Sequence, residues 1–214
     1  MLPLCLSHAY FRYQLSDVAE GLCYLHSRNV IHGDLKGVRR FPRSCFTSPL
    51  TSYQPNVLVD DSGHARIADF GLATVTQNFD SMSVSAQRGH TPRWSAPEVL
   101  YGGRCSKEAD IFAFAMVMIE VRYRLSIVRR APAYCRFIPI QIYTCAIPFS
   151  DITSVAAMLA VMNGKRPSRP THPALTDQLW TLIQCCWDQD PHLRPEVSDG
   201  LQVILVQSVS PPFR

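Results

Sequence analysis

The chain has 214 residues, of which 47% are hydrophobic and 18% charged, and its formal net charge at pH 7 is +4. This size and composition predict one globular domain with a single core. The eight cysteines form no Cys-x-x-Cys pair, so neither a zinc site nor a disulfide framework is indicated.

The N-terminal region predicts a helix and no targeting segment. Its first residues lack the basic region that precedes the apolar stretch of a secretory signal. Scattered, unpaired cysteines are typical of the cytosol or nucleus, so a cytoplasmic or nuclear location is predicted. Apolar residues then recur at helical spacing from Leu15 to Leu25, which predicts an amphipathic helix over residues 15–27.

The rest of the chain predicts more helix than strand. Residues 56–60 and 65–68 flank a turn containing Gly63, which predicts a small β-hairpin. Residues 107–120 predict a hydrophobic central helix, whose nine-residue apolar run is shorter than the roughly 20 residues of a membrane span. The fold class is therefore predicted as mainly α with a small β-hairpin, and further helices are predicted at residues 151–163, 175–187 and 195–206.

Three short motifs carry the functional information. They are His-Gly-Asp-Leu-Lys-Gly at residues 32–37, Asp-Phe-Gly at residues 69–71 and Ala-Pro-Glu at residues 96–98. Their order and rough spacing resemble the protein kinases, and specifically the C-terminal lobe of the Ser/Thr-type, tyrosine-kinase-like group. The resemblance implies a protein kinase-like fold and ATP-dependent phosphoryl transfer to serine or threonine of a protein substrate, with ATP and Mg²⁺ as cofactors.

The N-terminal lobe of such a kinase is expected to be missing. That lobe normally carries a Gly-rich loop and a strand lysine that hold the ATP phosphates. The residues before His32 contain one glycine, Gly21, and no lysine. We therefore expect residues 1–214 to form a partial kinase domain.

Two stretches interrupt the resemblance. The asparagine expected five positions after Asp34 is Asn56, which lies 22 positions after it. Removing residues 38–54 restores the family motif, and removing residues 121–141 rejoins the central helix to its usual following loop. Both stretches begin with Val-Arg and end with Gln. Their codons can therefore begin with GT and end with CAG, as the sequence of an unspliced intron does. Our interpretation is that both are translated introns.

The positive charge of the chain comes from these two stretches. They contain eight arginines and no acidic residue, so the remainder has 13 basic and 17 acidic residues and a net charge of −4. Nucleic-acid binding, which a basic chain would suggest, is therefore not predicted. Disordered basic loops are the expected structure of both stretches.

The resemblance assigns chemical roles to five residues. Asp34 would accept the proton of the substrate hydroxyl, and Lys36 would lie beside the transferring phosphoryl group. Asp69 would bind Mg²⁺, and Asn56 would hold a second ion if the loop could close across the insert. Leu58 matches the apolar floor under the adenine ring. The alternative for either aspartate alone is a turn or cap residue.

Other residues match structural positions of the family. His32 and Phe70 resemble its stacked hydrophobic spine, with Gly71 completing the second motif. Asp110 resembles the central-helix aspartate that anchors the catalytic-loop backbone; the alternative is an ordinary acidic residue at a helix start. Thr91 matches a threonine that steadies Asp34 and Lys36, and the alternative is an ordinary loop threonine.

Two further positions concern stability and regulation. Glu98 and Arg194 match a buried ion pair that ties the activation segment to the last helices. Gly33 replaces the arginine of the usual His-Arg-Asp motif, which pairs with a phosphorylated residue, so this regulatory ion pair is not expected here.

Two functions of different classes remain open at this point. The first is a Ser/Thr protein kinase, and the second is a catalytically dead, kinase-like binding or scaffold module. The chain as written is expected to show no kinase activity, because the phosphate-binding lysine and loop are missing and the insert splits the catalytic loop. The oligomeric state is not fixed by any of these motifs.

Overall fold

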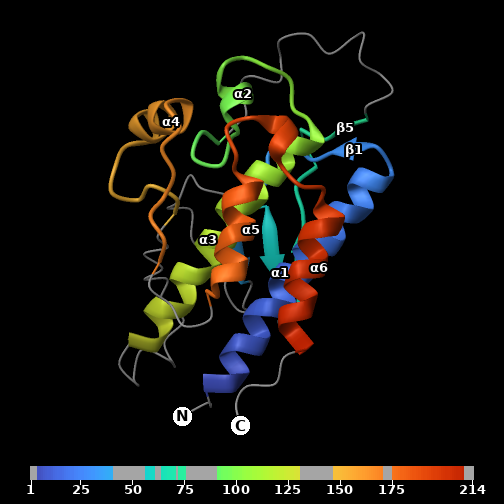
Figure 1. The fold of residues 1–214 in the computed structure, drawn as a ribbon, viewed down its shortest axis with the longest axis vertical. Coiled ribbons are helices and arrows are strands. Elements are labelled where there is room, and N and C mark those ends of the chain that lie inside the picture. Colours follow the sequence, from blue (N-terminus) through green and yellow to red (C-terminus); the bar gives the residue numbers. More distant parts are fainter. Residues whose placement is uncertain are drawn as a thin grey trace, which may run out of the picture.

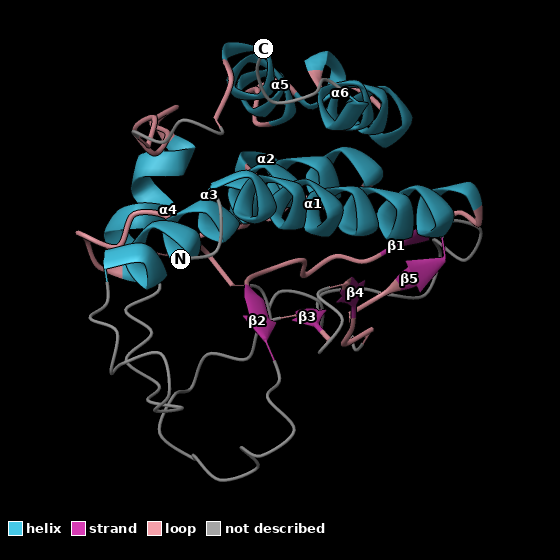
Figure 2. Ribbon diagram, turned by 90° about the horizontal axis from the view of Figure 1, so that it is seen from below, coloured by secondary structure: helices cyan, strands magenta, loops and turns pink. Residues whose placement is uncertain are grey.

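The computed structural model describes residues 4–40, 56–60, 64–70, 72–75, 91–130, 147–170 and 175–209. The fold is mainly helical (Figure 1), and its long helices α1 and α3 form a central layer (Figure 2). Figure 2 shows the short strands on one side of this layer and α5 and α6 on the other. Within the described ranges, no helix combines the length and the apolar character needed to cross a bilayer.

Each predicted helix is present, two of them are longer than predicted, and α2 and η3 were not predicted. Those predicted at residues 151–163, 175–187 and 195–206 are confirmed within a few residues. α1 begins before the predicted start at Leu15, and α3 extends past the predicted end at residue 120. The helices are α1 (Leu4–Ser27), α2 (Pro97–Leu100), α3 (Lys107–Arg130), α4 (Ser154–Met162), α5 (Asp177–Cys186) and α6 (Val197–Val209), with a short 3₁₀ helix, η3 (Pro191–Leu193).

In the part of the chain that the structure describes, five short strands form two small sheets. They are β1 (Val30–Ile31), β2 (Val38–Arg40), β3 (Val57–Val59), β4 (Ala65–Ile67) and β5 (Thr74–Val75). β3 and β4 form the predicted antiparallel hairpin, and β1 pairs antiparallel with β5. β2 was not predicted; it pairs parallel with β3, in the register Val38 to Val57.

The core is centred on α3. Every side chain from residue 109 to residue 120 is buried, including those of Phe112, Phe114 and Met116. A helix that is apolar on all sides must be covered on all sides, and α1 and α5 are among the elements that pack against it. Glu120, a fully buried carboxylate in this helix, accepts a hydrogen bond from the indole nitrogen of Trp94 at 3.1 Å.

Parts of the two unusual stretches are incorporated into regular structure. Residues 38–40 form β2, and residues 121–130 continue α3. The expectation of a disordered loop is therefore wrong for these residues, because β3 and α3 each extend their hydrogen bonding into the adjoining insert. Residues 41–54 and 131–141 lie outside the described residues, so the expectation about them is untested.

The expectation of a split catalytic loop is also wrong. The amide of Asn56 donates to the carbonyl of Lys36 at 2.8 Å, and the amide of Val57 donates to the carbonyl of Gly37 at 3.2 Å. These bonds and the β2–β3 pairing hold the two ends of the insert together. The backbone at Asn56 and Val57 is therefore bonded directly to the backbone at Lys36 and Gly37.

Candidate active site

The backbone that precedes Asp34 is fixed by one buried carboxylate from α3. Asp110 is 1% exposed. Its Oδ2 atom accepts hydrogen bonds from the amide of His32 at 2.8 Å and from the His26 ring at 2.9 Å, and its Oδ1 atom accepts one from the amide of Gly33 at 2.9 Å. A side chain 77 residues away in sequence from Gly33 thus sets the path of the loop.

Three side chains from separate segments converge on Asp34. Lys36 Nζ donates to Oδ2 at 2.5 Å. Thr91 donates to Oδ1 through its amide at 3.3 Å and its hydroxyl at 3.2 Å. The amide nitrogen of Asn56 reaches Oδ2 at 3.3 Å and the Asp34 carbonyl at 2.7 Å. Both oxygens of the carboxylate are therefore oriented, as a positioned proton acceptor requires.

Asn56 has one polar atom without a partner. Its side chain is fully buried, and its Oδ1 atom accepts no hydrogen bond from any of the described residues. A buried carbonyl oxygen of this kind is costly unless something binds it. Amide and carboxylate oxygens are the ligands that Mg²⁺ uses in proteins, so this atom fits the second-ion ligand that the sequence suggested.

The segment from Ala68 to Phe70 follows the hairpin. The His32 ring lies 5.6 Å from the Phe70 ring and approaches the carbonyl of Ala68 at 3.2 Å. His32 is fully buried, whereas Phe70 is 51% exposed. Asp69 is exposed and has a φ of +64°, a left-handed conformation that is uncommon for residues other than glycine. Gly71 lies outside the described residues.

Two remaining observations concern the ligand-binding expectations. Leu58, in β3, is half-buried, and its neighbours Val57 and Val59 are buried on the opposite face of the strand. Across the described ranges, no group of three or more His, Cys, Asp or Glu side chains is arranged to hold a metal ion.

Gly33 lies where a side chain would be difficult to accommodate. Its φ is +78°, and an added Cβ would lie 3.2 Å from the Leu72 carbonyl oxygen and 3.5 Å from the Cys105 sulfur. The thiol of Cys105 is directed to the Gly33 carbonyl at 3.7 Å. Burial, followed by the charges of Asp110, Asp34 and Glu98, raises the pKa of this thiol to about 11.

Replacing Gly33 by alanine is expected to lower the free energy of unfolding by about 1–2 kcal/mol, because a left-handed backbone is unfavourable for residues with a Cβ. The matched control is Gly200→Ala in α6, where the added methyl meets only ordinary contacts at 3.6 Å. That change should be neutral or stabilise by up to about 1 kcal/mol. Urea unfolding measures both, and effects of equal sign would contradict the explanation.

The predicted ion pair between Glu98 and Arg194 is present in the structure. Arg194 donates through both terminal nitrogens to the two carboxylate oxygens, at 2.6 and 2.8 Å. Its side chain is 0% exposed, and that of Glu98 is 24% exposed. The Arg194 guanidinium also donates to the carbonyls of Asp188 and Glu108 and lies over the Phe112 ring.

Sequence reasoning missed Arg93. This arginine is buried and donates to three carbonyls, those of Pro148, Phe149 and Ile152. Burial lowers its pKa, and the charge of Asp151 opposes that effect. The sequence signals this residue only by its position, two residues after Thr91 and directly before Trp94.

Comparison with known proteins gives consistent matches. Residues 53–204 match the family described as protein tyrosine and serine/threonine kinase. Serine/threonine-protein kinase STY17 of Arabidopsis thaliana is 32% identical over 191 residues, which is 88% of this chain and 26% of that protein.

Two further relatives show the same pattern of coverage. STY46 of the same plant is 30% identical over 87% of this chain and 25% of that protein. A probable serine/threonine-protein kinase of Dictyostelium discoideum is 29% identical over 88% of this chain and 16% of that protein. The chain thus spans about a quarter or less of these relatives.

Proposed function

Because the chain belongs to the protein tyrosine and serine/threonine kinase family, we propose that it carries the catalytic lobe of an ATP-dependent serine/threonine protein kinase. The observation that carries this proposal is the convergence of Lys36, Asn56 and Thr91 on the Asp34 carboxylate. We infer serine/threonine specificity from Lys36 in the catalytic loop and from the names of the relatives. We infer the tyrosine-kinase-like branch from the resemblance of the three sequence motifs.

Asp34 is the proposed proton acceptor for the substrate hydroxyl. Thr91 holds one carboxylate oxygen, while Lys36 and Asn56 hold the other, so little reorganisation is needed when a hydroxyl approaches. The Lys36 ammonium also provides the positive charge that a transferring phosphoryl group requires. Phosphoryl transfer depends mainly on such positioning and charge compensation.

Asp69 and Asn56 are the proposed Mg²⁺ ligands. The unpartnered Oδ1 atom of Asn56 supports this role, because the ion would remove the cost of leaving that oxygen buried and unpaired. Mg²⁺ neutralises the charge of the ATP phosphates when it is bound. Leu58 is the proposed contact for the adenine ring, by resemblance to the family.

Several finer features also belong to the proposal. The lysine and Gly-rich loop that hold the ATP phosphates would come from an N-terminal lobe outside these 214 residues, because residues 1–31 contain no lysine. Residues 38–54 and 121–141 are proposed to be translated introns. Because Gly33 replaces the arginine of the usual His-Arg-Asp motif, the kinase would lack the regulatory ion pair between that arginine and a phosphorylated residue.

Phosphate transfer tests the proposal. The polypeptide translated from the gene's full transcript, without residues 38–54 and 121–141, should phosphorylate a generic serine/threonine peptide in the presence of ATP and Mg²⁺. Asp34→Asn should reduce the rate by about 10²- to 10⁴-fold. Asp177→Asn, at a carboxylate 92% exposed on α5, is the control and should leave the rate unchanged.

Two outcomes would change the assignment. A folded polypeptide of this kind that transfers no phosphate would favour the catalytically dead binding or scaffold module. The 214-residue chain alone is expected to show no transfer. Transfer by that chain, lost on Asp34→Asn, would show that no separate phosphate-binding lobe is needed.

A further inference from the structure

Residues 91–94 form a tight turn that lies just before the Ala-Pro-Glu motif. The amide of Trp94 and the hydroxyl of Ser95 both donate to the carbonyl of Thr91, each at 3.1 Å. Pro92 occupies the second position of the turn, where its fixed φ is favourable. The turn is therefore held compact by its own residues, and these residues move together.

The side chains of this turn contact three separate segments of the fold. Thr91 donates to Asp34 Oδ1 through its amide at 3.3 Å and its hydroxyl at 3.2 Å. The indole of Trp94 donates to Glu120 of α3 at 3.1 Å. Arg93, which is 7% exposed, contacts the third segment, the loop that precedes α4. The turn thus connects the proposed proton acceptor to the core and to this loop.

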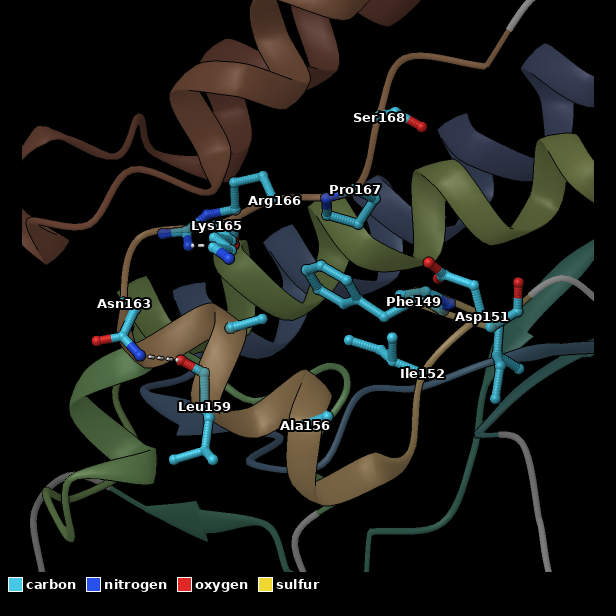
Figure 3. Close-up of a pocket in the computed structure, with 14 residues that line it drawn as sticks. Phe149, Asp151, Ile152, Ala156, Leu159, Asn163, Lys165, Arg166, Pro167 and Ser168 are labelled. Atoms are coloured by element: carbon cyan, nitrogen blue, oxygen red, sulfur yellow. Dashed lines mark hydrogen bonds between the residues drawn. The ribbon is translucent and has the colours of Figure 1, made fainter.

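Arg93 holds the turn against the loop that precedes α4. Its guanidinium donates to the carbonyl of Pro148 at 3.0 Å, to that of Ile152 at 2.5 Å, and to that of Phe149. Figure 3 shows this loop, with Phe149 and Ile152, where it leads into α4. Phe149 has a φ of +56°, a conformation that persists in a residue with a Cβ only where surrounding contacts fix it. The three bonds from Arg93 therefore fix the loop and the turn to each other.

The two bonds from Thr91 to Asp34 are sensitive to the position of the turn. Among the described residues, Thr91 provides both hydrogen bonds to Oδ1, and their lengths of 3.2 and 3.3 Å lie at the long end of the usual range. A shift of the turn away from Asp34 by about 0.5 Å would break both. Misplacement of a reacting group by about 1 Å can lower a rate about 10²-fold. The rate is therefore expected to depend on the contacts that fix the turn.

We propose that Arg93 is a positioning residue for the proton acceptor Asp34. It holds the turn against the loop that precedes α4, and the turn in this place keeps Thr91 within hydrogen-bonding distance of the carboxylate. Arg93 donates to backbone carbonyls and acts through Thr91, so it takes no part in the proton transfer itself. The proposal rests on the proposed function, and it adds to the site a residue outside the three sequence motifs.

Arg166 provides a matched control. Its guanidinium also joins separate segments through backbone carbonyls, because it donates to those of Trp187 and Lys165, each at 2.9 Å, and to that of Val161 at 3.3 Å. None of these residues belongs to the turn or to the loop that Arg93 holds. Replacement of either arginine by glutamine removes a charge and several hydrogen bonds, but only Arg93→Gln should affect Asp34.

Hydrogen exchange on the 214-residue chain tests the contact between the turn and Asp34 without any need for phosphate transfer. Arg93→Gln should speed exchange at the Thr91 amide at least about tenfold beyond the change that its unfolding free energy accounts for, because that amide loses its bond to Asp34. Arg166→Gln should not. Arg93→Lys keeps the charge but cannot reproduce the planar fork, so it should give the same change at a smaller size. It replaces Arg93→Gln in both experiments if that variant does not fold.

Kinetics test the effect on catalysis, in the polypeptide without residues 38–54 and 121–141 that the phosphate-transfer experiment uses. Arg93→Gln should lower kcat about 10- to 100-fold and leave KM for ATP within about threefold, whereas Arg166→Gln should leave kcat within about threefold. In a Thr91→Val background, the loss caused by Arg93→Gln should fall to about threefold or less, because Arg93 acts through Thr91.

Each of three outcomes would overturn the proposal. They are unchanged exchange at the Thr91 amide in Arg93→Gln, equal losses of kcat for Arg93→Gln and Arg166→Gln, and additive losses for Arg93→Gln and Thr91→Val. A wild-type polypeptide that transfers no phosphate would contradict the proposed function instead. Exchange at the Thr91 amide would then decide by itself whether Arg93 positions the Asp34 carboxylate.

Discussion

We expect Glu98→Ala to lower the free energy of unfolding by about 3 kcal/mol, because it leaves the buried guanidinium of Arg194 without its counter-charge. Removing one partner of a buried ion pair typically costs about 3–5 kcal/mol. The lower end applies here, since Glu98 is 24% exposed and Arg194 retains the carbonyls of Asp188 and Glu108. Urea unfolding monitored by circular dichroism measures the loss.

The control is an exposed ion pair of equal length. Arg169 and Asp177 are also 2.6 Å apart, but their side chains are 40% and 92% exposed. Asp177→Ala should cost about 1 kcal/mol or less, including its effect at the start of α5, because water and mobile ions screen exposed charges. Equal losses for Glu98→Ala and Asp177→Ala would show that burial does not determine the strength of the first pair.

We expect Asp110→Ala to lower the free energy of unfolding by at least about 3 kcal/mol. The change leaves the amides of His32 and Gly33 without their acceptor, and each buried donor left unpaired costs about 1–3 kcal/mol. The His26 ring loses its acceptor as well. Hydrogen exchange at the His32 and Gly33 amides, measured with the unfolding free energy, should show both amides losing protection.

Glu108→Ala separates this explanation from a general effect of acidic residues at a helix start. Glu108 and Asp110 both lie in the first turn of α3, but Glu108 is only half-buried. An interaction with the helix dipole alone predicts similar losses below about 1 kcal/mol for both changes. A loss for Asp110→Ala no larger than that for Glu108→Ala would contradict the anchoring role.

Local sequence patterns were sufficient for most of the helices and for the hairpin. α4, α5 and α6 were predicted because apolar spacing is a local signal that acts over one or two turns. The structure adds that Thr153 and Thr176 cap α4 and α5. The β3–β4 hairpin was predicted from its turn residues. β2 was not, because its partner β3 begins 19 residues later, at Val57, and pairs with it in parallel.

The sequence by itself determined the family and the residue types that could carry its chemistry, because Asp34, Lys36 and Asp69 lie in short motifs whose meaning depends on order along the chain. Only the tertiary structure decided which of these groups meet. Thr91 is 57 residues and Asn56 is 22 residues from Asp34, and hydrogen bonds over such distances form only when the core brings the segments together. The sequence suggested a loop broken by an insert, but the folded chain closes it, because backbone pairing on both sides of residues 38–54 satisfies the polar groups that a break would leave unpaired.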